Sequence, residues 1–313
     1  MKTLLRWSFV GLLFIFAGCG GSLESGPADA VKSWKDAIVE GKPEVFWLSL
    51  PPTYQKDVSD LLSKFADKMD VEIWNTTFSV VQTATSLVKD KKEIFAELVE
   101  EKMEDPEAGI EAAADLLDII VSSDLGELSA LEKLDVEKFL ADEGARLFQQ
   151  FNVLMKTTPQ SDQYTEELQA WLKDMEGTKI ATDSIEGETA TVLLQIGEQQ
   201  PKRLTLVKVE EKWLPKDMVD EWPSFIQQAN DSMDEMDEQI DDEQRQMAVT
   251  MLNGVEELLE QLSDAGSKEE MLGIAMQGFA GLMGGAGDDS GDAEGDDGDG
   301  GNDDGGDDDS DGL

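Results

Sequence analysis

The sequence contains no histidine and only one cysteine, Cys19. Without histidine the chain cannot form Ser-His-Asp or Cys-His nucleophile systems, and almost all zinc, copper and haem sites are excluded. A single cysteine excludes an intramolecular disulfide. Glycine-rich phosphate loops and nucleophile elbows are absent as well. We therefore expect no cofactor and no enzymatic activity; any chemistry would depend on carboxylates, lysines, Tyr54, Tyr164 or hydroxyl groups.

Basic residues are also scarce, because 25 lysines and arginines stand against 69 aspartates and glutamates, for a net charge of −44. Such a surface repels phosphate backbones, and no basic stripe interrupts it, so nucleic acid is excluded as a partner. Cationic partners, divalent ions and a high-salt environment remain compatible with it. The simplest interpretation is that the charge keeps the protein soluble.

Residues 1–18 are typical of an export signal peptide. Lys2 and Arg6 precede an apolar run of eleven residues, 7–17. This run is shorter than the roughly 20 residues of a membrane-spanning helix. The segment Phe16-Ala17-Gly18-Cys19 resembles the lipobox of bacterial lipoproteins, with Phe16 where leucine is commonest. The resemblance implies cleavage before Cys19 and a diacylglycerol on its sulfur, often with a further acyl chain on the new amine.

The lipid would fix the compartment of the protein. Two or more acyl chains anchor a protein durably, since each buried methylene contributes about 0.8 kcal/mol. Residues 19–26 then form a flexible tether. Gly20 and Gly21 follow the cysteine in place of aspartate, which by the family's sorting rules implies an outer-membrane lipoprotein of the cell envelope, facing the periplasm or the surface. The alternative is an ordinary secretory signal in which Cys19 is incidental.

Helical periodicity dominates residues 27–176. Pro27 opens a helix that ends near Gly41, and Asp105-Pro106 is a cap and first turn of another. Apolar residues at helical spacing predict buried faces, including those at Phe151 and Trp171. The acidic cluster within these helices is interpreted as a solvated face rather than as paired catalytic carboxylates; its members are Glu97, Glu100, Glu101, Glu104, Asp105, Glu107 and Glu111.

At Gly177 the period changes to two, which predicts an antiparallel meander over about residues 178–215. The expected strands are Lys179–Ile185, Thr189–Ile196, Lys202–Val209 and a short one at Trp213-Leu214. The alternation slips between Leu206 and Val207, which indicates a bulge or burial on both faces. Helices followed by a small meander define an α+β fold, with residues 27–216 as its domain. Trp47 and Trp213 are assigned to core packing.

This domain resembles nuclear transport factor 2-like lipoproteins of unknown function. The likeness lies in the opening helix with its Glu-Gly-Lys end, in Ile185-Glu-Gly-Glu-Thr-Ala-Thr-Val, and in Lys208-Val-Glu-Glu-Lys-Trp-Leu. It covers residues 27–50 and 177–215. It implies helices packed on a curved sheet, with a pocket in some members. The helical stretch between is longer than that fold needs, so an insertion or a different helix-rich fold is the alternative, and no catalytic residue of the family can be placed.

Residues 217–286 are expected to be methionine-rich helices, the first of which begins at Pro223. Their apolar stripe favours packing on the body; the alternative is a protein partner or self-association through residues 222–285. Ser267 with Glu270 is a capping-box pattern for the last helix. The glycine-laced apolar stretch 271–287 is expected to be a buried or interfacial helix rather than a second membrane anchor.

Residues 287–313 form an acidic low-complexity tail that we expect to be disordered. The calcium-loop-like run containing Asp297, Asp299, Asp303 and Asp304 has glycine at its fifth position and no glutamate at its twelfth. Weak, many-site cation association is therefore the most we expect from it, and no definite metal site.

Three functional hypotheses follow from these observations. The first is a non-enzymatic envelope lipoprotein whose α+β body binds a ligand or protein partner. The second is a structural or interaction protein acting through the methionine-rich helices and a cation-associating tail. The third, ranked last, is a small-molecule enzyme that uses carboxylates.

Overall fold

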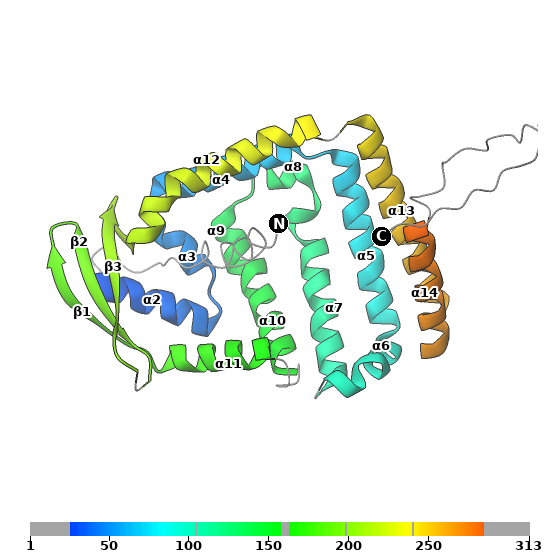
Figure 1. The fold of residues 1–313 in the computed structure, drawn as a ribbon, viewed down its shortest axis with the longest axis horizontal. Coiled ribbons are helices and arrows are strands. Elements are labelled where there is room, and N and C mark those ends of the chain that lie inside the picture. Colours follow the sequence, from blue (N-terminus) through cyan, green and yellow to red (C-terminus); the bar gives the residue numbers. More distant parts are fainter. Residues whose placement is uncertain (1–25, 104, 158–162, 198, 240, 285–313) are drawn as a thin grey trace, which may run out of the picture.

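The computed structural model describes residues 26–103, 105–157, 163–197, 199–239 and 241–284. It is an elongated arrangement with a sheet at one end and a helical hairpin at the other (Figure 1). The helical elements of the described chain are, in order, α2 Pro27–Glu40, α3 Glu44–Ser49, α4 Pro52–Lys68, α5 Val71–Asp90, α6 Lys92–Val99, η1 Glu100–Lys102, α7 Pro106–Ser122, η2 Asp124–Gly126, α8 Leu128–Leu131, α9 Val136–Phe139, η3 Leu140–Gly144, α10 Ala145–Thr157, α11 Gln163–Glu176, α12 Lys216–Gln239, α13 Asp242–Asp264 and α14 Lys268–Gly284.

The sheet is an antiparallel meander in the order β1-β2-β3-β4, and the predicted α+β class is confirmed. Gly187 turns β1 into β2 with a φ of +63°, a conformation that glycine adopts at little cost. Glu210 and Glu211 make the turn into β4 with positive φ values of 47° and 68°. The strands are β1 Lys179–Glu186, β2 Thr189–Gln195, β3 Lys202–Val209 and β4 Lys212–Pro215.

One face of this sheet packs against α2 and α3. Val192 of β2 and Leu206 of β3 are fully buried and form a core cluster with Trp34 of α2 and Phe46 of α3. Trp213 packs against the same cluster, as the assignment to core packing requires. The alternation of strand residues thus places every second side chain against the helices.

Of the two interpretations of the slip in β3, the bulge does not hold. Its pairing with β2 runs without interruption through Leu206 and Val207. The alternative, burial on both faces, fits better, because Leu206 is fully buried and Val207 is half-buried. The register shift lies instead in β1, between Thr182 and Ser184, where polar residues give no pattern that could reveal it.

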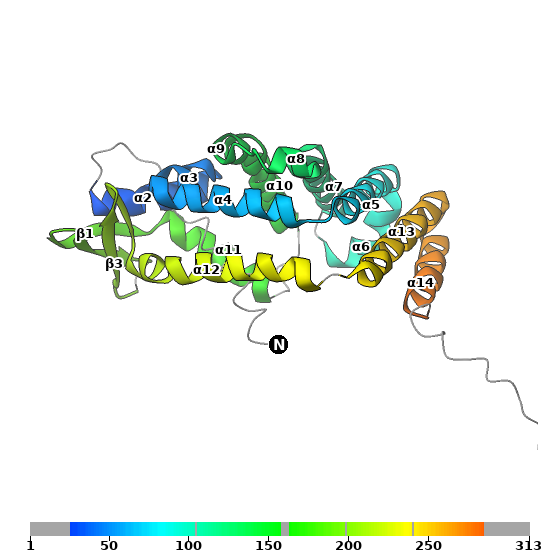
Figure 2. The same cartoon turned by 90° about the horizontal axis from the view of Figure 1, so that it is seen from above.

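Three helices, α5, α7 and α10, lie side by side in the middle of the molecule (Figure 1). Above them α12 runs along α4, and the two views show this pair extending from the sheet toward the opposite end (Figures 1 and 2). The α4–α12 contact is built on Trp222, whose ring stacks on Tyr54 with centroids 4.1 Å apart and whose indole Nε1 donates to Asp57 at 2.9 Å. Lys64 and Asp234 add an ion pair at 2.8 Å.

Three details of the helices differ from expectation. Pro223 does not open α12 but lies inside it, because the helix begins at Lys216 and tolerates the missing N–H. Phe151 of α10 and Trp171 of α11, both expected inward, are exposed. The apolar stripes of α10 and α11 are broader than the faces that their neighbours cover, so the margins of these stripes remain in solvent.

Candidate functional site

Beyond its first turn, α14, the last described helix, is uncharged and almost entirely apolar on all sides. No charged residue occurs between Glu270 and Asp288. One side of the helix is used for packing: Met271 is only 3% exposed and forms a cluster with Leu87 of α5 and Ala265, against which Ile274 also packs. A helix that is apolar all round is normally buried on all sides. The sides of α14 that do not pack against this cluster would therefore be expected to have a covering partner.

The approach of α14 to α13 depends on a glycine. A Cβ on Gly278 would lie 2.2 Å from Cδ1 of Leu258 in α13, so any larger residue there would require the Leu258 side chain to move aside. Ser267 caps the helix start as predicted, because the Glu270 amide donates to its Oγ at 3.2 Å; the Glu270 carboxylate accepts from Gly266 N at 2.9 Å, one residue before the amide that a capping box uses. The orientation of α14 on the body is therefore well defined.

The opposite flank of α14 is exposed. Leu272, Met276 and Phe279 retain 46%, 75% and 64% of their accessible surface. Their spacing of four and three residues places them on one face of the helix. A Cβ added to Gly273 or Gly281 would meet nothing within 4 Å, so no other part of the described chain approaches these positions. Of the two predictions for this helix, buried or interfacial, burial does not hold for this face.

A second exposed stripe lies on α13. Met247 and Met251 are 64% and 63% exposed and share a helical face with Leu258, the residue that Gly278 contacts. Thus α14 covers this face at Leu258 and leaves it open at Met247 and Met251. We call the exposed side chains of the hairpin the terminal apolar surface, whose members are Met247, Met251, Leu272, Met276 and Phe279.

The terminal apolar surface belongs to a hairpin held firmly on the body. Along α5, the Ser79 hydroxyl donates to the carboxylate of Glu256 at 2.6 Å. Near the start of α13, Arg245 pairs with Asp70 at 2.7 Å. At the hairpin turn, Lys91 Nζ donates to the carbonyl of Ala265 at 2.7 Å. Lys268 Nζ of α14 donates to a backbone carbonyl of α6. The methionine stripe was predicted to pack on the body, and it does so in part, since α13 runs along α5. Met247 and Met251 of this stripe stay in solvent.

The surroundings of this surface are acidic. Residues 241–284 carry nine acidic and two basic residues. Both basic side chains are engaged: Arg245 pairs with Asp70 and Glu72, and Lys268 donates to the carbonyl of Glu97. The exposed carboxylates of the hairpin include those of Asp242, Glu243, Glu257, Glu260, Asp264, Glu269 and Glu270.

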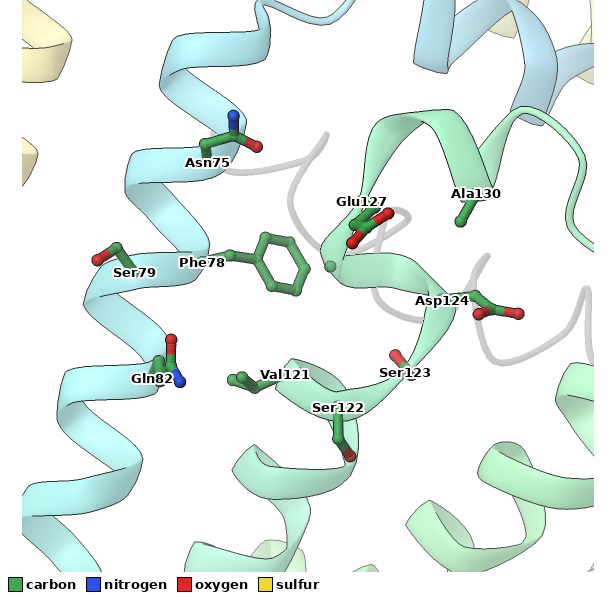
Figure 3. A pocket seen from close by; sticks show the side chains of 11 residues that line it. Asn75, Phe78, Ser79, Gln82, Val121, Ser122, Ser123, Asp124, Glu127 and Ala130 are labelled. Carbon is green, nitrogen blue, oxygen red and sulfur yellow. The ribbon is translucent and has the colours of Figure 1, made fainter.

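A cavity of about 480 Å³ lies between α5 and the chain that leaves α7. The ring of Phe78 points into it, with the amides of Asn75 and Gln82 on the same helix and the carboxylate of Glu127 across from them (Figure 3). Its remaining lining residues are Ser79, Val121, Ser122, Ser123, Asp124, Gly126 and Ala130. Helical spacing predicts only that the Phe78 side chain faces the core, so the sequence alone does not indicate this cavity.

The hydroxyl groups around the cavity serve the fold. Ser79 donates to Glu256, Ser122 donates to the carbonyl of Asp118, and Ser123 donates to the carbonyl of Ile120 while accepting from Leu125 N. The cavity therefore offers an aromatic ring, two amides and carboxylates, a set suited to hydrogen bonding with a polar molecule.

The sites expected from the sequence fall mostly outside the described residues. Cys19 and the tail positions Asp297, Asp299, Asp303 and Asp304 all do so. Within the described part of the chain, no three acidic or cysteine residues are grouped closely enough to hold a metal ion. Every described member of the predicted acidic cluster is exposed, as a solvated face requires; these are Glu97, Glu100, Glu101, Asp105, Glu107 and Glu111.

Among the described helices, none combines the length and hydropathy that crossing a bilayer requires. No protein-family model matches the chain, and no curated protein or solved structure is detectably similar to it. The likeness of residues 16–19 to a lipobox, and that of the α+β domain to nuclear transport factor 2-like lipoproteins, therefore stay predictions.

Proposed function

We propose that the protein is a non-enzymatic lipoprotein of the cell envelope that binds a protein partner through the terminal apolar surface. The observation that carries this proposal is the exposed flank of α14. Leu272, Met276 and Phe279 lie on one face of a helix whose other side is packed and whose end is capped. A flank of this kind is expected where a second molecule completes the burial.

The size of the surface supports a binding role. With roughly 200 Å² for each fully exposed side chain of this size, its five members expose about 600 Å². About 370 Å² of this area lies on one face of α14, within the ~300–600 Å² of the largest apolar patch on a monomeric protein, which is often a functional surface. Three of the five are methionines, whose unbranched side chains adapt to the shape of a partner.

The anchor is the second part of the proposal. Lipid on Cys19 would hold the chain at a membrane and restrict its partners to those of the envelope. In the described chain the sheet end and the terminal hairpin lie at opposite ends of the long axis (Figure 1). A body of this shape offers its partner a surface remote from the sheet.

The binding role can be tested by photo-crosslinking in intact cells. A photoreactive residue in place of Met276 should give discrete adducts with another protein, because this position is 75% exposed within the surface. The matched control is Ile185 of β1, which is 55% exposed at the other end of the molecule and should give none. Absence of adducts at Met276, or the same adducts at both positions, would refute the proposal.

A further inference from the structure

We infer that the partner is a basic amphipathic helix, with apolar residues on one face and lysines or arginines beside them. This inference rests on the proposed binding function and adds the chemistry of the partner. It follows from two properties of the hairpin taken together: the geometry of its exposed side chains and the sign of the charges around them.

The geometry suits a helix. Met247 and Met251 on α13, and Leu272, Met276 and Phe279 on α14, are spaced by three or four residues within their own helices. Apolar residues in this spacing receive the anchors of a partner helix, which recur at the same intervals. Methionine-rich surfaces accept helices of differing sequence because the thioether side chain repacks easily.

The charge selects the partner. The hairpin carries nine acidic residues against two basic ones, and both basic side chains are occupied by contacts within the chain. Thirteen further acidic residues follow at positions 288–313, with no basic residue among them. A positively charged helix would be drawn to this end of the chain by long-range attraction, and its lysines or arginines would face carboxylates when it binds.

The same charge argues against the other occupants of an apolar face. A second copy would bring an equal acidic field against the first, and the repulsion would oppose contact of the two hairpins. An anionic lipid surface would be repelled in the same way. A basic helix is the occupant for which the apolar contact and the electrostatic field act in the same direction.

The test uses a fluorescent synthetic peptide about as long as α14, with leucines on one helical face and lysines on the other. Its control has the same composition in an order that does not separate the two residue types along a helix. Both peptides are titrated into the purified full chain at about 0.1 M salt and followed by fluorescence anisotropy. We expect the segregated peptide to bind at least about tenfold more tightly than its control, because only it matches both features of the hairpin.

The variant that tests the site combines Leu272→Ser, Met276→Ser and Phe279→Ser, and Ile185→Ser is its matched control. The triple variant should lose the tenfold advantage, whereas the control variant should keep it; circular dichroism verifies that both are folded. Raising the salt to about 0.5 M should weaken both peptides while the difference between them persists, since apolar contact is not screened.

Equal binding of the two peptides, or an advantage that survives in the triple variant, would overturn the inference. So would a dimer, or binding to zwitterionic vesicles, that the triple substitution removes, because the occupant would then be a second copy or a lipid surface. If these results came with protein adducts at Met276 in cells, the partner chemistry would be wrong and the binding function would stand. Absence of adducts would refute the function itself.

Discussion

Replacing Met271 and Met276 separately by alanine removes the same atoms from two positions of one helix. Met271 is 3% exposed and packs with Leu87 and Ala265, whereas Met276 is 75% exposed. A buried methionine shortened to alanine costs roughly 2–5 kcal/mol, because the contacts are lost and a cavity remains. A surface substitution stays within about 0.5 kcal/mol. We therefore expect the free energy of unfolding to fall by at least ~2 kcal/mol in Met271→Ala and to be nearly unchanged in Met276→Ala.

The assay is urea unfolding followed by circular dichroism, together with amide hydrogen exchange in α14. The second measurement matters because α14 is the last described helix, so Met271→Ala can release it locally before the rest of the body unfolds. Faster exchange confined to α14 in Met271→Ala, with native exchange in Met276→Ala, is the expected pattern. Equal losses of stability in both variants would show that the two sides of α14 are not packed and exposed as described.

Three further predictions concern other parts of the chain. Gly273→Ala should stabilise the protein by about 0.5–1 kcal/mol in thermal unfolding, since its position is open, whereas Gly278→Ala should lose that gain against the leucine of α13; equal effects would contradict the close approach. Burial raises the pKa of Tyr54 above its usual 10.0, and the nearby carboxylates of Asp57 and Glu210 raise it further. The free energy of unfolding should therefore be intact below pH 10 and fall above it. In Tyr54→Phe this decline should be flatter in urea midpoints measured up to about pH 11. An unchanged decline in Tyr54→Phe would show that the loss of stability above pH 10 comes from other groups. Cys19→Ser should abolish acyl labelling and release the protein from membranes, and continued membrane association would refute the anchor.

Local patterns sufficed for the strands and turns of the sheet, although not for the register shift in β1. Alternating residues such as Val192 and the glycine at position 187 are set by strand geometry and turn conformation, both of which act within a few residues. The caps at Asp105 and Ser267 were predictable for the same reason, because each side chain accepts from an amide three residues away. These features need no knowledge of the tertiary structure.

The candidate site could not be predicted in the same way. In a helix that is apolar on all sides, the sequence does not show which face another helix will cover, so Met271 and Met276 look alike until α13 is placed. The cavity at Phe78 likewise depends on how far α5 stands from the turn after α7. Pro223 shows that a strong local signal can also mislead. Proline predicts a helix start, but here it lies inside α12, which begins at Lys216.

The central claim is that a partner covers the terminal apolar surface. Methionine oxidation tests it most directly, because the hairpin has methionines both on this surface and on its packed side. In the purified protein, Met247, Met251 and Met276 should oxidise much faster than Met271, as their exposure dictates. In intact envelopes the first three should become protected if a partner covers the terminal apolar surface. Oxidation at the same fast rate in both states would show that the surface stays uncovered, and would contradict the proposed function.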